Sequence, residues 1–100
     1  MKPEALVKAL EEAHARLSVR VRRERGAFRG GRCIVGEEEM VVLNRRHPPE
    51  AHVALLAESL RGLPVEQLYL TPAVRAALEE QWRRADAGLS DAPPDAADDA

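Results

Sequence analysis

The spacing of apolar residues changes at Leu17, and this change limits the folds open to the chain. From Leu6 to Leu17 the apolar residues recur three or four positions apart, as on one face of a helix. In the following LSVRVRRE, Val19 and Val21 alternate with polar residues, which is typical of a half-buried strand with arginines on its outer face. The chain must therefore pack at least one helix against a sheet.

The rest of the sequence predicts two more strands and two more helices. The stretch RCIVGEEEMVVLN indicates a hairpin whose turn spans residues 36–39 and holds the three glutamates in solvent. In chain order we expect a helix over 3–17, a strand within LSVRVRRE, strands over 32–35 and 40–44, and helices over 49–61 and 72–85. The predicted fold class is α+β, in the order α-β-β-β-α-α, with a small antiparallel three-stranded sheet packed by helices on one face.

Three sequence signals mark the ends of the predicted helices. Pro48 and Pro49 can only open a helix, and Asn44 or His47 is a candidate for its N-cap. Thr71, followed by proline, is a strong N-cap for the last helix. The segment between these two helices, which contains VEQLYL, is expected to be either a short helical turn or an extended piece.

The composition of the last fourteen residues differs from that of the rest. AGLSDAPPDAADDA shows no apolar periodicity and has two adjacent prolines, so it buries too little surface to offset the entropy of ordering. We predict a single α+β domain over residues 1–86 and a disordered acidic tail over 87–100. The tail holds four of the seventeen acidic residues and none of the fifteen basic ones, so the domain is weakly basic.

The few aromatic residues restrict the kinds of site that the domain can build. Phe28, Tyr69 and Trp82 are the only aromatic residues, so the core must consist of leucine and valine. A deep pocket with aromatic walls is not expected, and neither a small-molecule substrate nor a cofactor can be identified.

The cysteine content and the hydropathy of the sequence predict the cellular compartment of the protein. Cys33 is the single cysteine, which excludes an internal disulfide and fits a reducing compartment. Its place within a strand predicts a buried small apolar residue. There is no apolar run of eighteen residues and no signal-peptide pattern at the start, so we expect a cytoplasmic protein without membrane contact.

The stretch VVLNRRHPPE followed by HVALLAESLRGL carries a resemblance to a known family. Over residues 3–62 the order of elements and the LN…LLAESL spacing resemble the small bacterial ImmA/IrrE-type zincin-like metallopeptidases, in which HExxH binds zinc. Glu58, Ser59 and Gly62 stand at the three functional positions. The resemblance thus implies a degenerate domain without a metal site, and we expect no enzymatic activity. The chain also looks like other short bacterial proteins of similar length, which adds no mechanism.

No other residues combine into a recognisable catalytic or metal site. His14, His47 and His52 lack the four-residue spacing of a helical zinc pair, and we expect them to be surface or capping residues. The spacing suggests no histidine partner for Ser59, and GAFRGGR lacks the following helix of a phosphate-binding loop. We therefore predict no catalytic residues, no metal ligands and no cofactor.

The remaining feature is a concentration of arginines around the first strand. They form either a solvated face paired with nearby acids or a surface for an anion such as nucleic acid. A small sheet with open edges, or the last helix with Trp82, offers a second kind of surface, for another protein or a second copy. We expect a non-enzymatic protein-interaction or homo-oligomeric module, with a nucleic-acid-binding module as the alternative. The candidate residues for the alternative are Arg20, Arg22, Arg29, Arg32, Arg45 and Arg46.

Overall fold

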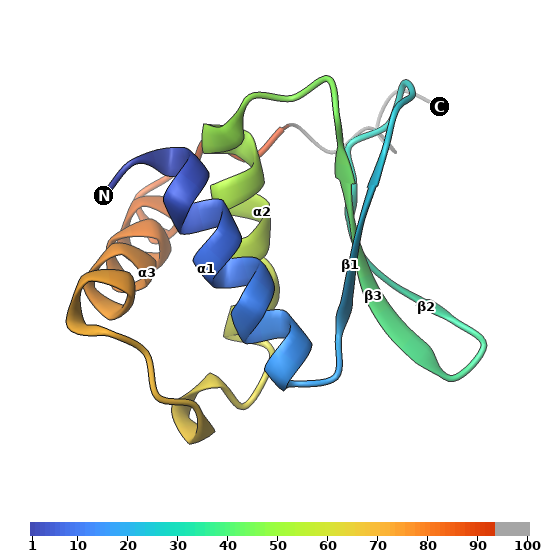
Figure 1. The fold of residues 1–100 in the computed structure, drawn as a ribbon. Helices are drawn as coiled ribbons and strands as arrows, with labels where there is room; N and C mark the ends of the chain where they lie inside the picture. The colour runs from blue at the N-terminus through green and yellow to red at the C-terminus, as the bar shows by residue number, and fades with distance from the viewer. Residues whose placement is uncertain (94–100) are drawn as a thin grey trace.

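The computed structural model describes residues 1–93 and has three helices and a three-stranded sheet (Figure 1). The predicted fold class and the order α-β-β-β-α-α are confirmed. The elements are α1 (Pro3–Arg16), β1 (Arg20–Glu24), β2 (Gly31–Val35), β3 (Glu38–Asn44), α2 (Pro49–Arg61), the 3₁₀ turn η1 (Val65–Gln67) and α3 (Pro72–Asp86).

The sheet is mixed, which corrects the prediction of an antiparallel one. Its strand order is β1-β3-β2: β2 and β3 form an antiparallel hairpin, and β1 lies parallel to β3 on the other side. The chain reverses once over residues 25–30 and again in the hairpin turn, so β1 and β3 run in the same direction.

The hydrophobicity of β3 explains why it is the central strand. After Glu38 and Glu39, its MVVL run is continuously apolar over four residues, as in strands that are covered on both sides, and neither β1 nor β2 has an apolar run of that length. Val41 and Leu43 have no solvent exposure and face the helices. Two edge strands of lower hydrophobicity therefore flank the strand that most needs burial.

Helix α2 is the centre of the molecule. It contacts α1, α3 and the sheet, and every residue from Ala51 to Leu60 except Glu58 is buried. The three helices lie on one side of the sheet, and the β2–β3 turn projects away from them (Figure 1). The expected core of leucine and valine is confirmed, with Leu10, Leu43, Leu56 and Leu60 fully buried.

The helix ends follow the sequence signals only in part. Thr71 caps α3, because its hydroxyl oxygen accepts a hydrogen bond from the Val74 amide at 3.3 Å. The N-cap of α2 is Pro48 without a side-chain hydrogen bond, so the expected cap from Asn44 or His47 is wrong. The connector after α2 begins with one helical turn, η1, and continues in an extended conformation.

The side chain of Asn44 is used elsewhere, to hold the loop before β2. Its amide group donates to the carbonyl oxygens of Gly26 and Phe28, each at 2.7 Å. Within the same loop Gly30 has a φ of +87°, and a Cβ there would lie 2.5 Å from the carbonyl oxygen of Val42. Only glycine fits this close approach, so Gly30 fixes where β2 begins.

The segment predicted as a disordered tail is described only up to residue 93, and residues 94–100 lie outside the described part. From Ala87 to Pro93 the chain turns back over the helices. Arg84 donates to the carbonyl oxygen of Leu89 at 2.7 Å, and Ala92 packs against the core. The segment therefore contacts the domain through Leu89, Ala92 and Pro93, whose carbonyl oxygen accepts from Arg29 at 2.8 Å.

Candidate functional site

The structure distributes the six candidate arginines over several places. Alternation along β1 puts Arg20 and Arg22 on the outer side of the sheet, away from the helices, and both are exposed. Arg32 pairs in register with the buried Val41, so it lies on the helix-facing side. Arg29 precedes β2. The arginines do not form one continuous basic surface.

Carboxylates lie beside most of these arginines. Four of the six have a glutamate oxygen within 4.0 Å of a guanidinium nitrogen. Arg45 and Arg46, exposed at the end of β3, form no ion pair within residues 1–93. The pairs are Arg20–Glu38 (3.6 Å), Arg22–Glu24 (2.7 Å), Arg29–Glu58 (3.4 Å) and Arg32–Glu39 (2.9 Å).

The three positions of the degenerate zinc motif line one depression of about 240 Å³ between α2 and β2. Glu58 is the only one of the three with a carboxylate, imidazole or thiol. The guanidinium of Arg32 lies against Gly62, where a Cβ would come within 2.7 Å of its Nη1 atom. Arg29 also lines the depression. A single carboxylate beside two cations does not fit a zinc ion, which needs about three protein ligands.

Ser59 lies in this depression and contacts His14, which the sequence did not suggest. Nδ1 of His14 lies 2.7 Å from the Leu10 carbonyl oxygen, which can only accept, so Nδ1 carries the proton. Nε2 then accepts a hydrogen bond from the Ser59 hydroxyl at 3.0 Å. Burial lowers the pKa of His14, the Arg32 charge adds to this effect, and Leu10 and Glu11 oppose it. The imidazole is thus neutral at pH 7.

A neutral histidine that accepts from a serine hydroxyl is the arrangement of an activated nucleophile. The surroundings argue against that role here. His14 has no solvent exposure and Ser59 is 7% exposed. Both residues lie inside helices, at positions where the backbone N–H groups bond within the helix and do not stabilise an oxyanion. The pair instead joins α1 to α2, and the His14 carbonyl oxygen accepts from the Val19 amide at 2.9 Å, next to β1.

The expectation of surface or capping histidines is wrong for two of the three. His14 is on the buried face of α1. The sequence indicated this position, because His14 follows Leu10 by four residues and so lies on the same helix face. His52 is buried in α2 and donates through Nε2 to the Asn44 carbonyl oxygen at 2.7 Å. His47 is half-buried before α2. Within residues 1–93, no three His, Cys, Asp or Glu side chains are close enough to hold a metal ion.

The prediction that Cys33 is buried is also wrong. Cys33 is exposed, and so are its neighbours on β2: Ile34 is 66% exposed and Val35 is 60% exposed. The reason is topological, because β2 is an edge strand and Cys33 faces the outer side of the sheet, away from the helices. Within residues 1–93, Ile34 and Val35 are the exposed large apolar residues of the sheet.

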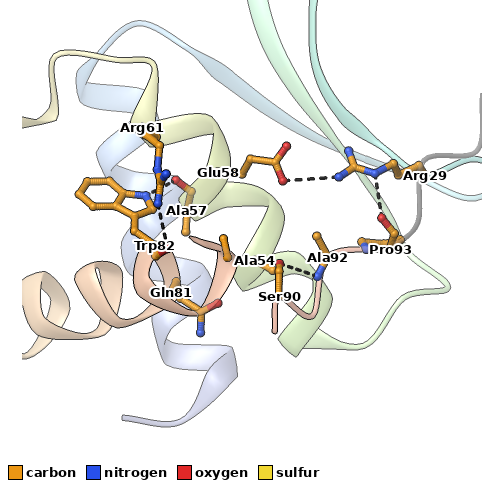
Figure 2. Close-up of a pocket in the computed structure, with 11 residues that line it drawn as sticks. Arg29, Ala54, Ala57, Glu58, Arg61, Gln81, Trp82, Ser90, Ala92 and Pro93 are labelled. Atoms are coloured by element: carbon orange, nitrogen blue, oxygen red, sulfur yellow. Dashed lines mark hydrogen bonds and ion pairs between the residues drawn. The ribbon is translucent and has the colours of Figure 1, made fainter. Parts of the chain in front are cut away.

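Trp82, the other candidate for a dimer surface, is used within the chain. Figure 2 shows the depression of about 310 Å³ that it lines between α2 and α3. Its indole nitrogen donates to the Ala57 carbonyl oxygen at 2.7 Å, and the Arg61 guanidinium lies 5.6 Å from the ring centre. Arg61 also pairs with Asp86 at 2.7 Å. These contacts fasten α3 to α2.

Comparison with known proteins gives no relative: no family model matches the chain, and no curated protein or solved structure is significantly similar. The resemblance to zincin-like peptidases therefore stays a prediction from the sequence. Within residues 1–93, no helix has both the length and the apolar character that crossing a membrane requires.

Proposed function

We propose that this domain is a non-catalytic protein-interaction module that binds another polypeptide by adding a strand to the free edge of β2. One observation carries the proposal: within residues 1–93, β2 is paired on one side only, and three of its four exposed residues, Cys33, Ile34 and Val35, are apolar. An edge of this kind presents a row of unpaired backbone groups to other chains. Because an unpaired single thiol fits a reducing compartment, we place the module in the bacterial cytoplasm.

The hairpin geometry identifies which backbone groups are free. Gly36, with a φ of +65°, is the first residue of a two-residue turn of type II′. The closing pair of such a turn, Val35 and Glu38, is hydrogen-bonded, and bonded and non-bonded pairs alternate from there. The N–H and C=O groups of Arg32 and Ile34 therefore point away from β3. They are the groups to which an added strand would bond.

The other edge of the sheet is protected against strand addition. Four of the five residues of β1, RVRRE, are charged, and charged side chains on an edge discourage pairing with other chains. Arg23 is in addition paired with Glu11 of α1 at 2.9 Å. Strand addition is thus favoured at β2 and disfavoured at β1.

The test is to remove one outward-facing donor without disturbing the hairpin. Ile34→Pro removes the outward N–H of residue 34, and proline is tolerated on edge strands where this group faces solvent. Ile34→Ala is the matched control, because it shortens the side chain and keeps the N–H. We expect Ile34→Pro to weaken the binding of a polypeptide partner at least about tenfold, the equivalent of 1.4 kcal/mol, and more than Ile34→Ala does.

Binding is measured with purified chains, by sedimentation for a second copy and by calorimetry for any other protein. Circular dichroism of both variants controls for folding. Strand addition at β2 is wrong if Ile34→Pro binds each polypeptide partner with the same affinity as the wild type does. A second copy of the chain counts as such a partner.

The nucleic-acid alternative depends on the same six arginines and has one observation in its favour, the two exposed and unpaired side chains of Arg45 and Arg46 within residues 1–93. The glutamate partners of the other four weigh against it. If all six contacted phosphates, the logarithm of the binding constant would fall with the logarithm of salt concentration with a slope of about −4 to −5. Such a slope in a salt titration would favour this alternative over the proposed function, and no binding at ~50 mM salt would exclude it.

A further inference from the structure

We infer that the polypeptide added to β2 is a second copy of this chain, running antiparallel, with the two Cys33 side chains facing each other at the two-fold axis. This rests on the proposed function, because it names the partner for the same free edge. Two properties of β2 carry it: the distribution of charge along the strand and the alternation of its free backbone groups.

The edge of β2 is basic where the strand begins and acidic where it ends. Arg29 and Arg32 lie at the beginning, each beside one glutamate of its own chain, and Glu37 and Glu38 lie at the hairpin turn. An antiparallel second copy brings the acidic end of each strand beside the basic end of the other, whereas a parallel copy would bring like charges together. The strand is therefore complementary to itself across a two-fold axis, as a symmetric dimer requires.

Because free groups must oppose free groups, the two-fold axis of an antiparallel pair passes through a residue of β2. An axis at Gly31 or Val35 opposes only one residue of each strand, which leaves axes at Arg32, Cys33 and Ile34. An axis at Arg32 places two guanidinium groups opposite each other, which destabilises the pairing. An axis at Ile34 opposes only residues 33–35 of the two β2 strands. An axis at Cys33 opposes all five residues of β2, and it sets Arg32 against Ile34 of the second copy.

The Cys33 register also places the two thiols within bonding distance. The backbone groups of Cys33 point toward β3, so the two cysteines form a pair without mutual hydrogen bonds. Cα atoms in such a pair lie about 4.5 Å apart, which is within the range of a disulfide. Cys33 alternates with Arg32, which is on the side of the buried Val41, so the Cys33 side chain is on the outer side of the sheet. The three helices lie on the other side (Figure 1).

The dimer joins two three-stranded sheets into one of six strands. Each copy contributes only a five-residue strand, so we expect a weak and transient dimer, of the class with small interfaces. The single thiol allows this weak dimer to be detected, because oxidation of the two Cys33 thiols links the two copies covalently.

The experiment oxidises the full chain with the azo compound diamide. Two thiols lose two protons and two electrons to the azo group, and one S–S bond forms between the copies. We expect a covalent dimer on a non-reducing gel that dithiothreitol converts back to monomer. Cys33→Ser must give none.

A cysteine two positions further on the same face tests the register. In the double variant Cys33→Ser/Val35→Cys the new thiol opposes Gly31 of the second copy, so we expect at least about tenfold less dimer than the wild type. In Cys33→Ser/Ile34→Cys the thiol opposes itself only if the axis is at Ile34. If either variant cross-links faster than the wild type, the Cys33 register is wrong.

Sedimentation in the presence of dithiothreitol separates the inference from the proposed function. A concentration-dependent dimer that Ile34→Pro abolishes, without cross-linking at Cys33, overturns the register and leaves strand addition standing. A chain that stays monomeric up to ~1 mM overturns the second copy as partner. Strand addition to another protein is then decided by the comparison of Ile34→Pro with Ile34→Ala.

Discussion

The strands β1 and β2 both have five residues and both lie beside β3, yet they present opposite edges to solvent. β1 is charged at four of its five positions, and β2 ends in Cys33, Ile34 and Val35. β1 is also tied to the helices: it follows the Val19–His14 backbone bond and holds Glu11 through Arg23. One edge of this small sheet is therefore protected by charge and by contacts with the helices, and the other edge is free for pairing.

The largest effect is expected where the helices meet beside β1. Ser59→Ala removes the hydroxyl that donates to His14 and leaves a buried imidazole nitrogen unpaired, which costs about 1–3 kcal/mol of unfolding free energy. The matched control on the open side is Cys33→Ala, which we expect to stay within ~0.5 kcal/mol of the wild type. Urea unfolding in reducing buffer measures both. If Ser59→Ala and Cys33→Ala lose the same unfolding free energy, the proposed difference between the β1 side and the β2 side is wrong.

Acid is expected to weaken the same junction. Because burial lowers the pKa of His14 in the folded state, the unfolded chain binds the proton more strongly. The stability contributed by neutral His14 is therefore complete above about pH 6.5 and is lost as the pH falls below it, by at most ~1.4 kcal/mol per pH unit. Urea unfolding at pH 7.5, 6.5 and 5.5 measures the slope. His14→Gln must flatten it; an unchanged slope in this variant would assign the effect to other groups.

The smallest effect is expected on the outer side of β1. Arg22→Thr keeps a good strand former and removes the exposed ion pair with Glu24, so we expect a loss below ~1 kcal/mol. It must also leave self-association unchanged, because the proposed dimer uses the other edge. If Arg22→Thr shifts the sedimentation equilibrium as much as Ile34→Pro does, the assignment of association to β2 alone fails.

The sequence was sufficient for elements whose limits depend on local chemistry. Helix α2 was predicted over residues 49–61 as observed, because Pro48 and Pro49 mark its start, Gly62 marks its end and an apolar stripe runs between them. The strand order was not predictable in the same way, because alternation within a strand does not say which strand lies beside it. The continuous MVVL run of β3 was the signal for a central strand.

The candidate site was predicted least well, because its contacts join distant residues. His14 and Ser59 are 45 positions apart in the chain, and only the packing of α1 on α2 brings them together. The exposure of Cys33 followed from the sheet order rather than from its neighbours in sequence. The ion-pair partners of the arginines were not predictable either, because a partner such as Glu58 for Arg29 lies in another element.

The parallel pairing of β1 with β3 has a consequence for how the chain is made. Arg20 lies opposite Met40, so the first strand is synthesised twenty residues before its neighbour. At about 5–20 residues per second the ribosome releases β1 roughly 1–4 s ahead of β3. The β2–β3 hairpin, closed by a two-residue turn, forms within microseconds of its completion. During that interval β1 has no strand with which to pair.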